Sequence, residues 1–348
     1  MGESHPHPRA PHHPVLHNEY CINRRQRLRA CHVCREVCPA AVYQVPQGHE
    51  PKWENCLNCG LCSAQCPARC ITPSKSEMRD YLFAMMEADL PTISCGHSSA
   101  EGMLQVSCVG AIPWEYLAYL SVTHNVVLYT GECEGCLSGH GKECVATTLG
   151  QLEKFHGGDS THVIVSEEAV EEPQDLRVRS SVFLGATKRG QDALAQAYSD
   201  IRSRDYGGLV FRKMLADLLD FVSSKAEMPV DCVVDLPQPN ERCYGCGICA
   251  DICPHGALRV ETEGSGEAEG SGRVNASLQA WKCVGCGTCA IVCRRKAMEE
   301  PSPRAVPTLR SVELGEFFVR VCSQCGRPLP PEQEGERCVL CLRSRLSR

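Results

Sequence analysis

The sequence predicts an α+β multidomain chain, in which two cysteine-rich modules flank a small α/β domain with a parallel sheet. The chain has 348 residues, a length that suggests two or three domains. Its 27 cysteines fall mostly in Cys-x2-Cys runs, which in a long chain indicate metal or cluster ligation in a reducing compartment. Between these runs, residues 91–230 alternate short apolar stretches with helical patterns, as α/β units do.

Composition and charge argue against several classes of protein. The net charge is −6, and no basic stripe with interleaved aromatic residues indicates nucleic-acid binding. No run reaches the roughly 18 apolar residues that a membrane span needs. Residues 1–18 lack the apolar core of a secretory signal, and the stretch after Arg24–Arg25 is too polar for a twin-arginine signal. We expect a cytoplasmic protein whose residues 1–18, rich in Pro and His, form a disordered tail.

The strongest motifs are "CYGCGICADICP" at 243–254 and "CVGCGTCAIVC" at 283–293. Both have the Cys-x2-Cys-x2-Cys-x3-Cys spacing of bacterial [4Fe–4S] sites, in which the fourth cysteine binds the neighbouring cluster. Zinc knuckles do not need the third and fourth cysteines at this spacing, so we predict clusters. One cluster is assigned to Cys243, Cys246, Cys249 and Cys293, and the other to Cys283, Cys286, Cys289 and Cys253.

The N-terminal block, residues 19–75, repeats this pattern with one irregularity. The run "CLNCGLCSAQCP" at 56–67 is regular, but nine residues separate Cys21 from Cys31 in the run before it. The assigned ligand sets are Cys21, Cys31, Cys34 and Cys66 for one cluster, and Cys56, Cys59, Cys62 and Cys38 for the other. If the Arg-rich insertion leaves Cys21 unbound, the first cluster becomes [3Fe–4S]. The two isolated cysteines, Cys70 and Cys232, are expected to pack as small buried residues.

Both blocks resemble the dicluster ferredoxin domains found in iron–sulfur subunits of larger oxidoreductases. The resemblance implies dicluster ferredoxin-like folds at 19–75 and 231–305, and one-electron transfer through four [4Fe–4S] clusters. Arg294 follows Cys293 where the family pattern has Pro. Since this Pro is not a ligand, the departure leaves the cluster assignment intact.

The last module, residues 306–348, carries a Cys-x2-Cys-x12-Cys-x2-Cys pattern. Two such thiolate hairpins make a tetrahedral site, which favours structural zinc in a zinc-ribbon-like module. The alternative is a single iron, as in rubredoxin. The predicted metal ligands are Cys322, Cys325, Cys338 and Cys341.

The middle domain, residues 76–230, is expected to begin with a helix at 76–90, capped by Ser76. Further expected elements are a helix at 113–121 and a strand within 161–168. Three strand-like segments lead to cysteines, and the carboxyl ends of parallel strands are where α/β proteins bind ligands. The cysteines expected to converge at this edge are Cys95, Cys108, Cys133 and Cys136, with Cys144 as a fifth candidate.

Three interpretations of this edge stay open: a further iron–sulfur cluster bound by four of the five cysteines, a redox disulfide between Cys133 and Cys136, and a structural zinc site. We favour the cluster. The pattern "CVG" followed by "GECEGC" is similar to the delta subunit of methyl-viologen-reducing hydrogenases, which implies an α/β electron-transfer module with a cluster. The spacing of Cys133 and Cys136 is shorter than that resemblance leads us to expect.

No nucleotide fingerprint, Walker loop or Ser/His/Asp set is legible in the sequence. We therefore expect a non-catalytic electron-transfer subunit that relays electrons to or from a catalytic oxidoreductase subunit. That partner would be a molybdenum or tungsten enzyme, a hydrogenase or a flavoprotein, with soluble ferredoxin as a further electron partner. The alternative is a thiol/disulfide reductase that acts at Cys133 and Cys136 and is fed by the ferredoxin clusters.

Overall fold

The computed structural model of the chain describes residues 13–25, 31–45, 49–87, 92–123, 125–158, 163–170, 207–226, 231–263 and 271–343. The chain divides into two compact units. The first unit comprises Met1–Val233 with Ala305–Leu309, and the second unit comprises Val234–Arg304 with Arg310–Arg348. Each unit is described by itself below.

The cysteine-rich start of the first unit is closed by a short antiparallel pair, β1 (Val15–Leu16) with β2 (Ile71–Thr72). Strand β1 lies within the range that we expected to be a disordered tail, and residues 1–12 of that range lie outside the described residues. The placement has a physical reason, because the apolar β1 gains a hydrogen-bonding partner and His13 stacks on Trp53 with ring centroids 4.3 Å apart. The short helices between these strands are α1 (Ile22–Arg25), α2 (Val33–Glu36), the 3-10 turn η1 (Trp53–Asn55) and α3 (Leu61–Ala64).

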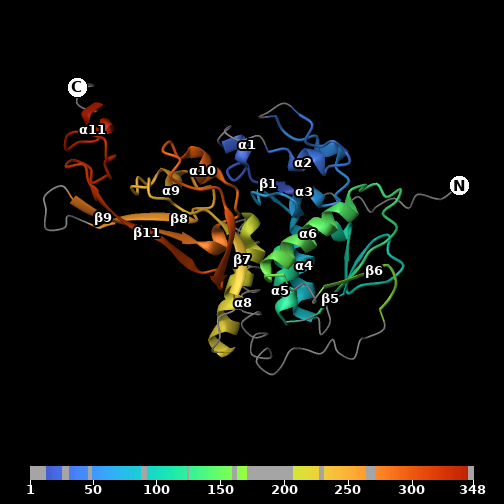
Figure 1. The fold of residues 1–348 in the computed structure, drawn as a ribbon. Coiled ribbons are helices and arrows are strands. Elements are labelled where there is room, and N and C mark those ends of the chain that lie inside the picture. The colour runs from blue at the N-terminus through green and yellow to red at the C-terminus, as the bar shows by residue number, and fades with distance from the viewer. Residues whose placement is uncertain are drawn as a thin grey trace. The chain divides into compact units, whose positions relative to one another are not determined.

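The rest of the first unit is built on a four-stranded parallel sheet with strand order β4-β3-β5-β6 (Figure 1). Its strands are β3 (Thr92–Cys95), β4 (Leu104–Val106), β5 (Val126–Tyr129) and β6 (Val163–Ser166). All three pairings are parallel, so the predicted parallel sheet is confirmed. The connecting helices are the turn η2 (Val109–Ala111), α5 (Trp114–Thr123) and α6 (Gly141–Phe155).

Helix α4 (Lys75–Glu87) begins one residue earlier than we expected, and its cap is Ser74, not Ser76. The Ser74 backbone N–H donates to Glu77 Oε2 at 3.0 Å, and the Glu77 N–H donates to Ser74 Oγ at 3.3 Å. This reciprocal pair is a capping box, which satisfies two backbone donors at the start of a helix. Glu77 stands three residues after Ser74, and this spacing decides which serine caps the helix.

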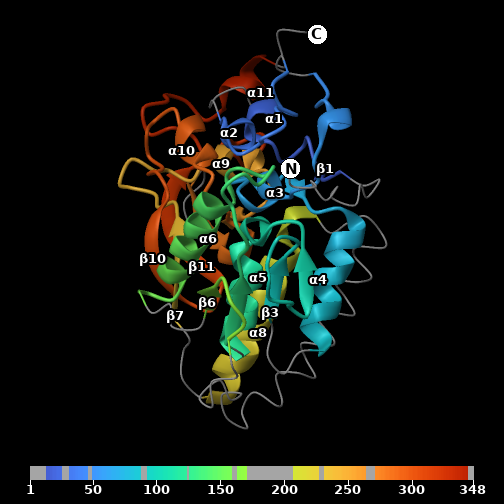
Figure 2. The same ribbon diagram turned by 90° about the vertical axis from the view of Figure 1, so that its right-hand side faces the viewer.

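Aromatic packing joins three helices of the first unit: α4, α5 and α8 (Val210–Ala226), the last preceded by the turn η3 (Gly207–Leu209). Tyr116 lies edge-on to both Tyr81 and Phe211, with ring centroids 4.9 and 5.1 Å apart. All three rings are buried, and burial of such a side chain contributes about 1.5–3 kcal/mol. Figure 2 shows these helices side by side. They form an apolar core next to the sheet.

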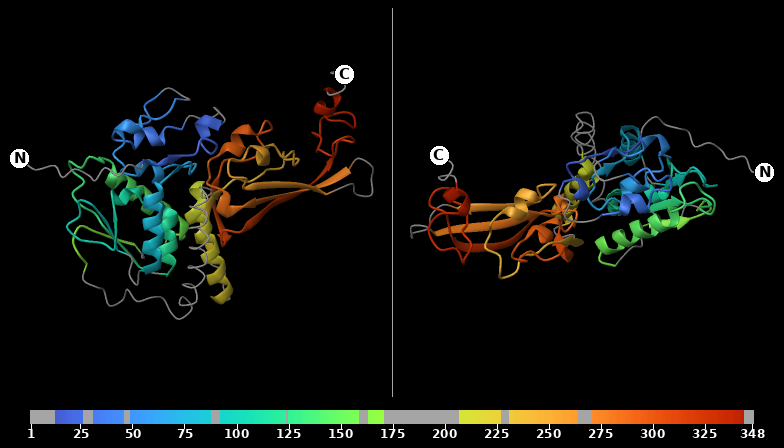
Figure 3. Two further views of the ribbon diagram at one scale, coloured as in Figure 1. Left: turned by 180° about the vertical axis from the view of Figure 1, so that it is seen from behind. Right: turned by 90° about the horizontal axis from the view of Figure 1, so that it is seen from above.

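The second unit contains an antiparallel sheet of order β11-β9-β8 (Figure 3). Its strands are β8 (Leu258–Glu263), β9 (Ser271–Gln279) and β11 (Ser311–Arg320). Short helices lie in the cysteine loops and at the end of the chain: α9 (Ile248–Ile252), η4 (Ala280–Lys282), α10 (Thr288–Val292) and α11 (Val339–Arg343). The strands β7 (Asp231–Leu236) and β10 (Ser302–Pro307) pair with each other, and the division between the two units falls within both. In the described parts of the chain, no helix has the length and apolar character to cross a membrane.

Candidate iron–sulfur and metal sites

Each cysteine loop of the second unit turns on a glycine with a left-handed backbone. Gly247, with φ 79°, precedes α9, and Gly287, with φ 72°, precedes α10. Glycine adopts this conformation at little cost, so the chain can wrap tightly enough for three thiols to face one point. Burial, followed by the neighbouring thiols of Cys246 and Cys243, raises the pKa of Cys249 to about 12. The three cysteines of the first loop therefore lie together.

The fourth cysteine of each run faces the other loop, as the ferredoxin spacing predicts. The Cys293 thiol is among the neighbours that raise the pKa of Cys243, after burial and the closer Cys246. Cys253 is likewise among the thiols around Cys289, whose pKa burial raises most. The Sγ atoms of Cys253 and Cys293 each accept a hydrogen bond from the backbone N–H four residues later, at 3.2 and 3.1 Å. Such bonds stabilise the charge of cluster-bound sulfur.

A cavity of about 340 Å³ opens beside one of these sets, and all four of its assigned ligands line the cavity: Cys243, Cys246, Cys249 and Cys293. The other walls are largely apolar, with Leu258, Val260 and Met298 among them. At the rim, the Arg295 guanidinium lies 5.4 Å from the Tyr244 ring and forms an ion pair with Glu332 at 2.5 Å. An apolar chamber lined by four thiols fits a [4Fe–4S] cluster, which needs thiolate ligands and exclusion of water.

Several N-terminal cysteines that share an assigned ligand set lie near one another. Burial, then the thiols of Cys66, Cys31 and Cys21, raises the pKa of Cys34 to about 12. Burial, then Cys38 and Cys56, raises the pKa of Cys59 to about 11. Cys62 lies beside these same cysteines. Buried thiols of this kind ionise readily only beside positive charge, which a bound iron centre supplies.

Cys70, which we expected to pack as a small buried residue, also contacts a cysteine of the first of these sets. It is buried, as expected, but its Sγ lies 3.4 Å from Cys66 Sγ. The neighbouring Cys70 thiol lowers the pKa of both Cys21 and Cys66. The sequence signal was available: Ala257 and Ala297 stand at the equivalent position of the second-unit runs.

The strand-end cysteines of the parallel sheet lie together. Cys95 ends β3, Cys108 follows β4, and Cys133 and Cys136 lie in the loop after β5. Burial, then the thiols of Cys59, Cys95 and Cys133, raises the pKa of Cys108 to about 12. Cys133 in turn lies near Cys95 and Cys136. Gly141, the first residue of α6, lies against two of these thiols. A Cβ at this position would be 3.1 Å from Cys108 Sγ and 3.7 Å from Cys133 Sγ.

Cys144, the fifth candidate, occupies a different place. It is buried with Leu61, Cys108 and Ala111, and Cys59 packs against the same cluster. Two glycines allow this close packing, since a Cβ on Gly60 would lie 2.8 Å from the Ala111 side chain, and one on Gly110 would lie 3.0 Å from the Cys144 Cβ. Cys144 therefore stands between the second N-terminal ligand set and the strand-end cysteines.

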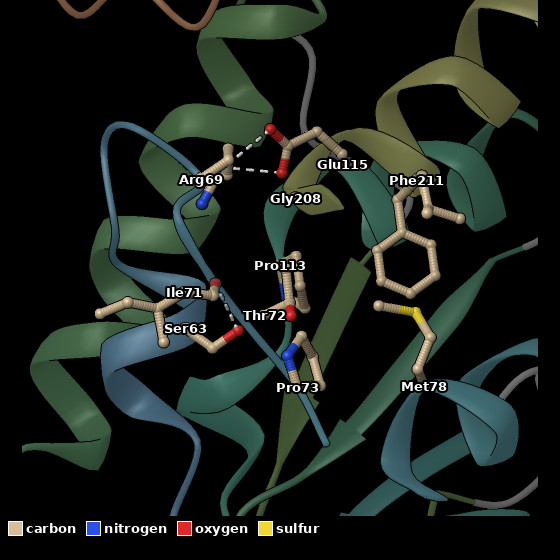
Figure 4. Close-up of a pocket in the computed structure, with 11 residues that line it drawn as sticks. Ser63, Arg69, Ile71, Thr72, Pro73, Met78, Pro113, Glu115, Gly208 and Phe211 are labelled. Carbon is tan, nitrogen blue, oxygen red and sulfur yellow. Dashed lines mark hydrogen bonds and ion pairs between the residues drawn. The ribbon is translucent and has the colours of Figure 1, made fainter. Parts of the chain in front are cut away.

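A buried charge network holds the segment after Cys66 against the α/β domain (Figure 4). The Arg69 guanidinium makes two bonds to the Glu115 carboxylate, at 3.0 and 2.9 Å, and donates to the Ala64 carbonyl at 2.6 Å. Arg212 of α8 lies 3.6 Å from the same carboxylate. The side chains of Arg69, Glu115 and Arg212 are 11%, 4% and 5% exposed. No side chain fits at Gly208, where a Cβ would lie 1.8 Å from the Arg69 carbonyl oxygen.

The C-terminal cysteines form a smaller site. The sulfur atoms of Cys322, Cys325, Cys338 and Cys341 all lie within 4.8 Å of one another, and those of Cys325 and Cys338 are 3.7 Å apart. A tetrahedral zinc site with Zn–S bonds of about 2.3 Å places its sulfurs about 3.8 Å apart. This set therefore fits one tetrahedral ion. The four cysteines of a cubane cluster bind four separate irons, so their sulfurs do not share one centre.

Residues 242–297 match the family model described as "4Fe-4S dicluster domain". The match covers both cysteine runs of the second unit and ends before the C-terminal site. Among curated proteins, no relative of the chain is found. The matched domain and the cysteine-rich sequence make this an iron–sulfur protein with at least one [4Fe–4S] cluster and a role in electron transfer.

Proposed function

We propose that the chain is an electron-transfer subunit that carries four [4Fe–4S] clusters, a further iron–sulfur cluster at the strand-end cysteines, and a structural zinc at the C-terminal site. The observation that carries the proposal is the contact between Cys59, a ligand of the second N-terminal cluster, and the buried group of Leu61, Cys108 and Cys144. It brings a ferredoxin loop against the edge where the fifth cluster would lie.

This packing supports a continuous path for electrons within the first unit. Cys62 and Cys59 belong to one ligand set, and the Cys59 thiol lies near enough to Cys108 to affect its ionisation. Glycines at positions 60 and 110 let the two loops pack closely, since a Cβ on Gly60 would lie 2.8 Å from the Ala111 side chain and one on Gly110 would lie 3.2 Å from the Leu61 side chain. The strand-end cluster would then be the point at which electrons enter or leave the first unit.

The remaining parts of the proposal concern the partner. We propose that a catalytic oxidoreductase subunit, namely a molybdenum or tungsten enzyme, a hydrogenase or a flavoprotein, exchanges electrons with this chain. Soluble ferredoxin would be the second electron partner. The clusters would supply one-electron chemistry, while the protein sets potentials through burial and hydrogen bonds to sulfur.

The test is a count of iron, acid-labile sulfide and zinc in the full chain and in four single variants. C34A, C62A and C95A each remove one proposed ligand, and we expect the iron of one cluster to be lost or reduced in each. The control is C232A, because Cys232 is a buried cysteine outside the assigned ligand sets and its thiol donates to the Val306 carbonyl at 3.5 Å. Full iron in C95A would refute the fifth cluster. Full iron in C34A and C62A would refute the N-terminal pair.

The thiol/disulfide reductase remains the rival, and alkylation of the reduced full chain discriminates. A reductase predicts rapid modification of Cys133 and Cys136 in a protein with the iron of four clusters alone. The cluster predicts that both thiols stay protected until the iron is removed. Burial raises the pKa of Cys133, which counts against the reductase because reactive thiols have lowered pKa values.

A further inference from the structure

The loop between the two cysteine pairs of the C-terminal site, residues 326–337, reaches a cluster site of the same unit. We call this segment the C-terminal loop. Its residues Pro330 and Glu332 line the cavity into which the Cys243 ligand set opens, namely Cys243, Cys246, Cys249 and Cys293. The C-terminal module therefore supplies part of the wall around the proposed cluster of this set.

The side chain of Arg295 connects the C-terminal loop to the cysteines. Its Nη1 donates to both carboxylate oxygens of Glu332, at 2.5 Å each. Its Nε donates to the Arg242 carbonyl, immediately before the first ligand, at 3.2 Å, and its guanidinium lies 5.4 Å from the Tyr244 ring. Arg295 also follows the last ligand, Cys293, by two residues. One side chain thus joins the loop to both ends of the Cys243 ligand set.

Hydrogen bonds at the C-terminal site hold the two ends of the loop together. The Ser323 N–H donates to the Glu336 carbonyl at 2.8 Å, and the Cys338 N–H donates to Cys322 Sγ at 3.2 Å. Both bonds join the first cysteine pair to the far end of the loop, as an ion shared by the four thiols would. In small modules of this kind, binding of the metal supplies the free energy of folding. Loss of the ion should therefore release the loop.

We propose that the C-terminal metal module is a cap on the cluster of the Cys243 ligand set, closed by the ion pair of Arg295 and Glu332. With its ion bound, the module holds Pro330 and Glu332 at the cavity and keeps water and iron chelators from the cluster. Without the ion, the loop leaves the cavity and the cluster becomes accessible. The inference rests on the proposed cluster and on the proposed metal of the C-terminal site.

The experiment measures release of iron from the full chain, loaded with clusters and metal, to bathophenanthroline disulfonate under anaerobic conditions. The side chains of Arg295 and Glu332 are 33% and 65% exposed. In E332A we therefore expect one cluster's share of the iron to leave about two- to fivefold faster than in the wild type, the factor that a partly exposed ion pair gives. The charge reversal R295E/E332R should release this share more slowly than either single reversal.

Removal of the ion tests the link between the two sites. C338S should release the same share of iron at least as fast as E332A, and C338S/E332A should release it no faster than C338S, because the loop has already left the cavity. The electron paramagnetic resonance spectrum of the reduced protein identifies the cluster concerned. The signal that E332A loses first should be the one that is missing from C249A, which lacks a ligand of this set.

E334A is the matched control, since Glu334 is an exposed carboxylate of the same loop, two residues after Glu332. It should release iron at the rate of the wild type. Zinc content shows in E332A and E334A that the C-terminal module has kept its ion and its fold.

Two results would overturn the inference. The first is release of iron from zinc-containing E332A at the rate of the wild type. The second is a C338S/E332A variant that exceeds C338S by the same factor by which E332A exceeds the wild type. Failure of the proposed function looks different, because C249A would then keep all its iron, or the wild type would hold no ion at the C-terminal site.

Discussion

Replacement of Glu115 with Gln tests how firmly the buried charge network holds the Cys66 segment to the α/β domain. The substitution keeps the volume of the side chain and one carbonyl oxygen, but it removes the negative charge that the guanidinium groups of Arg69 and Arg212 share. Both cations stay largely buried, with 11% and 5% of their side chains exposed. The two guanidinium groups then lose the anion that they share.

The size of the effect follows from that burial. Breaking a buried ion pair by removing one partner costs about 3–5 kcal/mol. For a unit of this size, each kcal/mol lowers the melting temperature by roughly 2–4 °C. We therefore expect E115Q to melt roughly 6–20 °C below the wild type.

The assay is thermal unfolding of the cluster-loaded chain under anaerobic conditions, followed by far-ultraviolet circular dichroism. The control is D217N on helix α8, which removes an ion pair between Lys213 and Asp217 at 2.5 Å. These side chains are 49% and 46% exposed, and an exposed pair contributes only about 0.3–0.5 kcal/mol. Equal melting temperatures for E115Q and D217N would show that the network adds no more than a surface pair.

Three further predictions concern single positions. G60A should destabilise the first unit by roughly 2–5 kcal/mol, because φ is 74° and the new Cβ would lie 2.8 Å from Ala111; a melting temperature equal to the wild type would contradict this. G150A should raise stability by roughly 0.5–1 kcal/mol, since it replaces an exposed glycine within α6 that has open space around it, and a lowered melting temperature would count against that account. Elemental analysis of C338S should show that zinc is lost and that the iron content is unchanged. If the wild type contains no zinc and C338S loses iron, the C-terminal site holds a rubredoxin-like iron instead.

The parts of the protein that depend on short spacing could be predicted from the sequence. The ferredoxin runs of the second unit are local motifs, in which the interval between thiols fixes how they meet iron, and the match at 242–297 agrees with that prediction. The parallel sheet was also predictable, because apolar segments around a helix favour a right-handed crossover with parallel strands. The helix cap was misassigned, since Ser74 and Ser76 are both plausible caps until the partner Glu77 is considered.

Contacts between segments that are distant in the sequence could be seen only in the folded chain. No pattern in the chain indicates that Cys144 is buried with Leu61 and Cys108, with Cys59 packed against the same cluster. Nor does the sequence reveal that Arg69, Glu115 and Arg212 share one buried network. Local spacing governs contacts within a loop, whereas contacts between elements depend on how whole faces pack, and that packing is a property of the complete fold.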